Sequence, residues 1–355
     1  MPVSARGPLR HVLVHLLTPL LMCLGMGLAY MSAFVTPEPH DMPVAVVGTH
    51  ARAHAFAASV ADESGGALDV RTLASRAQAV DALKSLDISG AYLPDAKAPE
   101  LLVASAGSDM SALAAEKVFT RVAAAQGSPL KVTDVAHPVS DDPTGQGLFF
   151  LLVAVSIGSY ASVAALGAAG GALRMRVRAG LAVGVAFAVS LIGAALAGPV
   201  FHLAHHGLWG VWALSWLYSA GILLIGVGLH TFLKRWTTLA MMVLFVMLNF
   251  TSSGGLFRPE LQNGFFGSLH SFWNGAGFVE GVRAQQYFGG HGLGGHVGTL
   301  VAWLAVGALL TAVAGLVERR RAAVAAAAPA EPTAAEVSET SRASEEEEME
   351  ESVGV

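Results

Sequence analysis

The chain has 355 residues, of which 54% are hydrophobic and only 13% are charged, and its formal net charge is −5. Its mean hydropathy is +0.56, whereas ordinary soluble domains carry about 25% charged residues. This composition excludes a typical water-soluble protein and indicates an integral membrane protein.

The apolar residues gather in separate runs. A bilayer core about 30 Å thick requires roughly 20 apolar residues for each crossing helix. Such runs lie near 11–35, 147–171, 179–201, 211–233, 237–250 and 297–317. We therefore predict an α-helical polytopic membrane protein with six transmembrane helices in a 1+5 arrangement. A small α/β extracytoplasmic domain, residues 36–145, separates helices 1 and 2.

The first run has two interpretations. Arg6 and Arg10 before an apolar core, with Met31–Ala33 as a weak cleavage site, would suit a signal peptide. The apolar stretch 12–35, however, is longer than the roughly 7–15 residues of a signal sequence. We interpret 1–35 as a cytoplasmic N-terminus and an uncleaved transmembrane helix, which contains the single cysteine, Cys23.

Basic residues predict the orientation, because Lys and Arg in short loops favour the cytoplasmic side. Basic residues occur in every second segment between the apolar runs. They are Arg6 and Arg10 before the first run, Arg174, Arg176 and Arg178 between the second and third, Lys234 and Arg235 between the fourth and fifth, and Arg319, Arg320 and Arg321 after the sixth. The alternating pattern predicts a multi-pass protein of the plasma membrane with both termini cytoplasmic. The 36–145 domain then lies outside.

Within 36–145 the pattern alternates between strands and helices. Strands are expected at 42–48, 68–73, 90–94, 101–106 and 130–135, and helices at 49–64, 75–86 and 110–125. The first helix ends before the Gly65-Gly66 pair, a common termination signal. Such alternation favours a sheet covered by helices.

This domain shows no sign of catalysis. Gly48 follows a strand, but the G-x-G-x-x-G spacing is absent there, and no Walker A sequence occurs in the chain. Residues 36–145 contain eight Lys or Arg against fourteen Asp or Glu, a balance that argues against nucleic-acid binding. We interpret it as a folded non-catalytic module.

Residues 146–318 are expected to form a five-helix permease domain, and 319–355 a disordered acidic cytoplasmic tail. The tail is first rich in Ala and Pro and then contains the acidic run 345–351, a composition typical of disorder.

Histidines offer an alternative chemistry. His202, His205 and His206 form one cluster, and His291 and His296 lie in another predicted outside loop, so a metal or haem site is conceivable. Metal ligands usually include carboxylates or thiolates, and the neighbouring Gly-Leu-Trp-Gly is typical of an interfacial loop. We therefore expect no metal, no cofactor and no catalytic residue.

The most unusual segment of the membrane half follows the fifth run. Small residues at 252–255 interrupt the helix, and an aromatic group follows, comprising Phe265, Phe266, Phe272 and Trp273. Irregular backbone at membrane depth is tolerated where it is buried in protein or lines a cavity. We predict an outer re-entrant hairpin at about 251–290.

This segment resembles the C-terminal signature of type-2 ABC exporter permeases, which has a helix break, an aromatic segment and a Glu-Gly-Leu-Arg-like ending. The matching residues are Asn249, Ser252, Ser253, Gly254, Gly255, Pro259, Glu260, Leu261, Phe265, Phe266, Leu269, His270, Glu280, Gly281 and Arg283. Phe250 replaces the usual Pro after Asn. The 1+5 plan and the strand 43–47 resemble the phage infection protein (YhgE/Pip) branch of the type-2 ABC transporter permease superfamily.

The resemblance implies a permease subunit of an exporter for an amphipathic or hydrophobic substrate, without its own ATPase and without enzymatic activity. Its implied partners are an ABC ATP-binding subunit, a second permease subunit in a homo- or heterodimer, and membrane lipids, but no nucleic acid. The family's coupling loop maps to 172–178, with Arg174, Arg176 and Arg178 as candidate contacts.

Two other function classes remain open. The chain is alternatively a membrane-anchored scaffold or surface receptor that acts through residues 36–145. A redox or metal-dependent membrane enzyme built on the histidines is the third possibility.

Overall fold

The computed structural model describes residues 6–94, 98–170 and 172–327. The molecule divides into two compact units, Met1–Ala314 and Gly315–Val355, and the contacts discussed below lie within the first. The predicted acidic tail falls mainly outside the described residues, because the description ends at 327.

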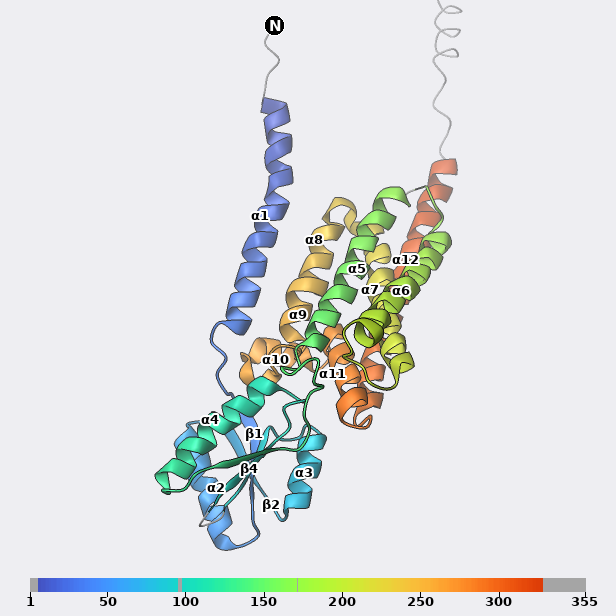
Figure 1. The fold of residues 1–355 in the computed structure, drawn as a ribbon. Helices are drawn as coiled ribbons and strands as arrows, with labels where there is room; N and C mark the ends of the chain where they lie inside the picture. The colour runs from blue at the N-terminus through green and yellow to red at the C-terminus, as the bar shows by residue number, and fades with distance from the viewer. Residues whose placement is uncertain (1–5, 95–97, 171, 328–355) are drawn as a thin grey trace, which may run out of the picture. The chain divides into compact units, whose positions relative to one another are not determined.

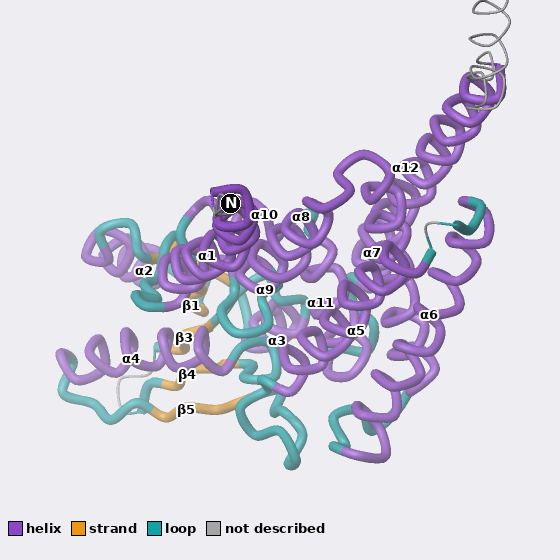
Figure 2. Tube along the Cα trace, turned by 90° about the horizontal axis from the view of Figure 1, so that it is seen from above, coloured by secondary structure: helices purple, strands orange, loops and turns teal. Residues whose placement is uncertain are grey.

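The sheet domain follows the first helix (Figure 1). Its strands have the order β2-β1-β3-β4-β5, and all neighbours are parallel except the antiparallel pair β3–β4. Figure 2 shows β5 at one edge of the sheet. The elements are α1 (Arg6–Phe34), β1 (Met42–Val47), α2 (Ala51–Ser64), β2 (Leu68–Leu73), α3 (Arg76–Lys84), β3 (Gly90–Leu93), β4 (Glu100–Val103), α4 (Asp109–Ala125) and β5 (Lys131–Asp134).

Helices cover both faces of this sheet (Figure 1). Side chains alternate between the faces of a strand, so Val44 packs in one cluster with Val60 of α2 and Phe119 of α4. Ala45 packs on the other face with Leu83 of α3. The domain therefore has three layers, with α2 and α4 on one side of the sheet and α3 on the other.

Local signals in the sequence explain the helix ends. The Ser75 hydroxyl accepts a hydrogen bond from the backbone N–H of Gln78 and begins α3, and Ser108 does the same for α4. Gly65 ends α2 in the left-handed conformation, with φ of 60°, which glycine adopts without steric cost. The predicted alternation of strands and helices is thus confirmed, although β4 is shorter than the expected strand 101–106.

The remaining helices pack around a second apolar core that includes Leu152, Tyr218, Leu223, Phe245 and Phe278. The helices are α5 (Gly147–Ala169), α6 (Met175–Ala195), α7 (Leu208–Leu233), α8 (Thr237–Met242), α9 (Leu248–Ser252), α10 (Gly264–His270), α11 (Asn274–Tyr287) and α12 (Leu293–Ala327). Short π-helices lie at Leu196–Val200 and Val243–Met247, and 3-10 turns at Lys234–Trp236 and Pro259–Leu261.

Among the described residues, four helical segments are long and apolar enough to cross a membrane. They are Gly147–Gly167, Met175–Val200, Leu208–Ser252 and Leu293–Ala327, and Pro19–Phe34 is a shorter apolar helix. Large apolar side chains such as Phe187 and Ile192 are exposed on α6, as expected for a surface in contact with lipid. The chain is therefore mostly helical, with a small sheet and four helical segments that could span a membrane.

The 45-residue segment Leu208–Ser252 is folded back on itself. Tyr218 and Asn249 are 31 positions apart, yet the Asn249 Nδ2 atom lies 2.6 Å from the Tyr218 hydroxyl. A straight helix would separate them by about 46 Å. The reversal occurs at Lys234, whose φ is 48°. The two arms correspond to the runs predicted at 211–233 and 237–250.

Candidate functional site

The predicted helix break is present where α9 ends at Ser252. Gly254 has a φ of +71°, which favours glycine because other residues are strained in the left-handed region. Gly255 lies against α5, and a Cβ atom there would come within 2.9 Å of the Phe149 Cβ. Ser252 and Ser253 are fully buried. The small residues thus allow both the turn and the close approach of α5.

A helix that ends inside the protein leaves unpaired carbonyl groups. Side chains from the following segment contact the last two carbonyls of α9 and the carbonyl of Gly254 just beyond it. Gln262 Nε2 donates to the Thr251 carbonyl at 2.6 Å. His270 Nδ1 lies 2.9 Å from the Ser252 carbonyl, and Arg283 Nη2 donates to the Gly254 carbonyl at 3.1 Å. The 258–283 segment therefore folds back to cap the broken helix.

Glu280 of α11 is at the centre of a buried ion cluster. Its carboxylate lies 2.5 Å from Arg283 Nη1 and 3.4 Å from Arg258 Nη1. The side chains of Glu280 and Arg283 are each only 3% exposed. Arg258 also lies 3.4 Å from Glu260. Two guanidinium groups thus face two carboxylates, and we call these four residues, Arg258, Glu260, Glu280 and Arg283, the ion cluster.

Charge balance controls protonation in this cluster. Burial by itself would raise the pKa of Glu280, but Arg283 and Arg258 outweigh that effect and lower it to about 2. Burial lowers the pKa of the neighbouring His270. At neutral pH Glu280 is therefore ionised and His270 is neutral, so the His270 Nδ1–H can donate to the Ser252 carbonyl.

The ion cluster also connects the helices to the sheet domain through Glu260. One carboxylate oxygen of Glu260 accepts hydrogen bonds from the hydroxyls of Ser89 and Ser111, each at 2.9 Å. The Glu260 backbone carbonyl accepts from the His40 N–H at 2.8 Å. We call these contacts the Glu260 latch. They join the break in the helical part to residues before β1, before β3 and in α4.

A polar network lies beside the break among otherwise apolar helices. The Tyr218 hydroxyl of α7 is hydrogen-bonded to Ser156 of α5 and to Asn249 of α9. Gly275 of α11 packs directly against the Asn249 amide, where a Cβ atom would clash. The predicted Asn249 thus joins three helices, whereas sequence reasoning missed Tyr218, whose polar group within an apolar run was the available signal.

Most residues of the predicted family motif converge on this region. Gly281 lets α11 approach α7, since a Cβ atom there would lie 3.3 Å from Leu214 Cδ2. Pro259 begins the short turn that carries Glu260. Phe266 is buried and Phe265 is 61% exposed, so only one of the two aromatic residues contributes to the packed site. Arg258, which bridges Glu260 and Glu280, was not predicted as a site residue.

The candidate coupling segment 172–178 lies apart from the motif, and only its first part is a loop, because α6 begins at Met175 and contains Arg176 and Arg178. Arg174 and Arg176 are exposed. Arg178 is only 6% exposed, and its aliphatic chain lies near Gly170. Two of the three predicted arginines are therefore accessible to a partner, and Arg178 belongs to the packed end of the helices.

Comparison with protein-family models, curated proteins and solved structures finds no match for this chain. Within the described ranges, no group of three or more His, Cys, Asp or Glu side chains is placed to hold a metal ion.

The latch gives a first prediction. Replacing Glu260 with alanine removes the acceptor shared by Ser89 and Ser111 and leaves Arg258 with one carboxylate. We therefore expect the free energy of unfolding to fall by about 1–3 kcal/mol. Hydrogen exchange should accelerate at 258–263 and at the start of α4. Glu38→Ala, at an exposed carboxylate, should leave both segments unchanged. Unaltered exchange at the start of α4 in the Glu260 variant would contradict the latch.

Proposed function

We propose that the chain is the membrane-spanning permease subunit of an ABC-type exporter. It moves an amphipathic or hydrophobic substrate outward, and a separate subunit hydrolyses ATP. One observation carries the proposal: residues of the motif that resembles exporter permeases, although spread over 249–283, meet in one buried site. Asn249, Gly254, Glu280 and Arg283 all contribute to the packing or capping of the broken helix.

In this proposal six helices cross the plasma membrane. They comprise α1, α5, α6, the two arms of Leu208–Ser252 and α12. Both termini are cytoplasmic, the sheet domain is outside, and the α10–α11 region forms the outer hairpin. Two such subunits enclose a substrate path, and movements at the ATPase pass through the helices to that hairpin.

The contacts of the ion cluster suit such transmission. Arg283 binds the broken end of α9, Glu280 joins Arg283 to Arg258, and Glu260 joins Arg258 to the sheet domain. A displacement of α9 relative to α11 must therefore stretch charged contacts that are costly to break when buried. The helix break and the sheet domain are expected to move together.

Co-purification of the full chain from its native membrane tests the proposal. We expect a P-loop ATPase to accompany it, with an ATPase rate that responds to amphipathic compounds. Charge reversal at the coupling loop, Arg174→Glu with Arg176→Glu, should release that subunit. Arg320→Glu with Arg321→Glu makes the same charge change at exposed positions of α12 and should not.

Absence of any ATPase from preparations that retain the folded chain would refute the exporter proposal. If deletion of 36–145 then abolished all function, the scaffold or receptor alternative would be favoured.

A further inference from the structure

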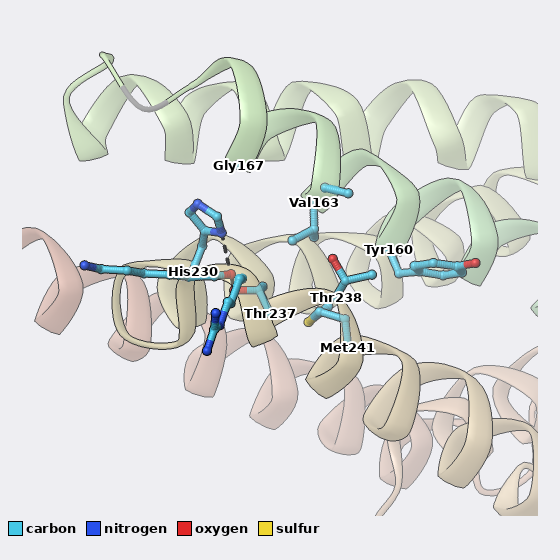
Figure 3. Close-up of a pocket in the computed structure, with 10 residues that line it drawn as sticks. Tyr160, Val163, Gly167, His230, Thr237, Thr238 and Met241 are labelled. Carbon is cyan, nitrogen blue, oxygen red and sulfur yellow. Dashed lines mark hydrogen bonds between the residues drawn. The ribbon is translucent and has the colours of Figure 1, made fainter. Parts of the chain in front are cut away.

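A cavity with basic and apolar side chains lies between α5 and the turn that joins α7 to α8 (Figure 3). Its volume is ≈ 280 Å³, close to the lower end of the roughly 300–1,000 Å³ typical of small-molecule sites. Val163 and Met241 contribute apolar surface, and Tyr160 lies at one end of the group (Figure 3). The cavity is far larger than a single ion requires.

The side chains that give this cavity its charge are basic. Lys234 and Arg235 line it together with the hydroxyls of Thr237 and Thr238, and none of the described residues that line it carries a carboxylate. Both basic residues are exposed. The Arg235 guanidinium lies 5.4 Å from the centroid of the Trp236 ring, a pairing suited to the membrane interface. The cavity therefore offers two cations and the Thr238 hydroxyl to an anion.

The backbone that holds the cations is strained and well fixed. Lys234 has a φ of 48° and a ψ of −114°, a conformation that costs a residue other than glycine of order 1–3 kcal/mol. Its carbonyl accepts from the Thr237 hydroxyl at 2.7 Å, and that hydroxyl lies 3.3 Å from His230 Nδ1. A glycine would make the same reversal without strain, so lysine here keeps a charge at the cavity at the expense of backbone energy.

We propose that this cavity binds the phosphate group of an anionic phospholipid. Lys and Arg side chains bind phosphate oxygens through charge-assisted hydrogen bonds, and basic pockets between transmembrane helices bind acidic lipid head groups. Apolar Val163 and Met241 beside the cations suit a ligand that joins a phosphate to an apolar body. A soluble phosphate ester shares the phosphate chemistry without the apolar body. The site is separate from the ion cluster and does not depend on the exporter proposal.

Binding of a fluorescent phosphatidylglycerol to the full chain in neutral detergent tests this proposal, with the matching phosphatidylcholine as the neutral probe. At about 150 mM salt, charges farther than roughly 8 Å from the phosphate are largely screened. We expect the wild type to prefer phosphatidylglycerol. Lys234→Gln with Arg235→Gln should weaken phosphatidylglycerol binding roughly tenfold.

A matched control removes two other exposed cations that lie outside the cavity. Arg174→Gln with Arg176→Gln should change the affinity less than about twofold, because neither residue lines the site. Equal losses in both double variants would mean general attraction of anions to basic surfaces and would overturn the proposal. So would equal binding of the two lipids by the wild type.

A second variant keeps all the charges and reduces the space. A Cβ atom at Gly167 would lie 2.8 Å from His230 Cε1, so Gly167→Ala should displace the ring and weaken lipid binding. Unchanged melting temperatures would verify that the variants fold. Displacement of the lipid by millimolar glycerol phosphate would identify the head group alone as sufficient, whereas displacement only by the intact lipid would show that the apolar body contributes. Unimpaired phosphatidylglycerol binding by both Gly167→Ala and the Lys234/Arg235 variant would refute the site.

Discussion

Replacing Glu280 with glutamine is expected to destabilise the protein by about 3–5 kcal/mol, the usual cost of removing one partner from a buried ion pair. Glu280 is only 3% exposed and faces both Arg283 and Arg258. The amide keeps the size of the side chain but not its charge. Arg258 would then keep only Glu260, Arg283 would lose the carboxylate that it contacts, and the cap on α9 would loosen.

Thermal unfolding in detergent provides the measurement, and a fall in Tm of roughly 10 °C is expected. Glu100→Gln is the control, because Glu100 also faces two cations, Arg76 and Lys131, but their side chains are 46% and 69% exposed, and the amide keeps an oxygen that can accept from the Thr133 hydroxyl. A pair of that kind contributes at most about 1 kcal/mol. Equal effects of the two substitutions would show that the ion cluster has no special role in stability.

The pH dependence of the stability of wild type and Glu280→Gln provides an independent test. The pKa of Glu280 falls from 4.5 to about 2 on folding. The ionised carboxylate therefore makes its full contribution to the free energy of unfolding above about pH 4.5, and this contribution disappears as the pH falls toward 2. That shift corresponds to about 3 kcal/mol. The stability difference between wild type and Glu280→Gln should therefore shrink over this interval. A difference that stays constant from pH 5 to pH 2.5 would contradict the assigned pKa shift.

The local features of the fold could be predicted because they depend on neighbours in sequence. Ser75 begins a helix and Gly65 ends one, and both functions follow from side-chain or backbone properties of single residues. The break at Ser252–Gly255 was visible for the same reason. The turn at Lys234 was also predicted as a loop. Its positive φ was not predicted, because lysine rarely adopts a positive φ.

The partners in the candidate site could not be predicted in the same way. Glu280 and Arg283 are one helical turn apart, so their contact follows from helix spacing. Arg258 is 22 positions from Glu280, and Ser89 is 171 positions from Glu260. Such pairs depend on how the 253–263 loop returns to the sheet domain, which neither hydrophobic pattern nor residue type determines. The predicted motif contains Glu260, Glu280 and Arg283 but not Arg258, which links Glu260 to Glu280.

The packing around the break also leads to a strong prediction for Gly254. Gly254→Ala places a side chain at a φ of +71°, and the new Cβ atom would lie 2.5 Å from His270 Cε1 and 2.9 Å from Glu280 Oε1. The left-handed conformation costs alanine about 1–2 kcal/mol. Displacement of His270 and Glu280 costs further stability, so we expect the free energy of unfolding to fall by about 3 kcal/mol in total.

Gly264→Ala is the matched control for this substitution. Gly264 is the first residue of α10, and a Cβ atom there would meet nothing within 4 Å. Alanine also restricts the unfolded chain more than glycine does, so this variant should be neutral or slightly stabilised. Measuring both variants by thermal unfolding, and hydrogen exchange at 252–256, separates a general glycine effect from the role of the break. If Gly254→Ala were as stable as Gly264→Ala, residue 254 would not be held in the left-handed conformation against His270 and Glu280.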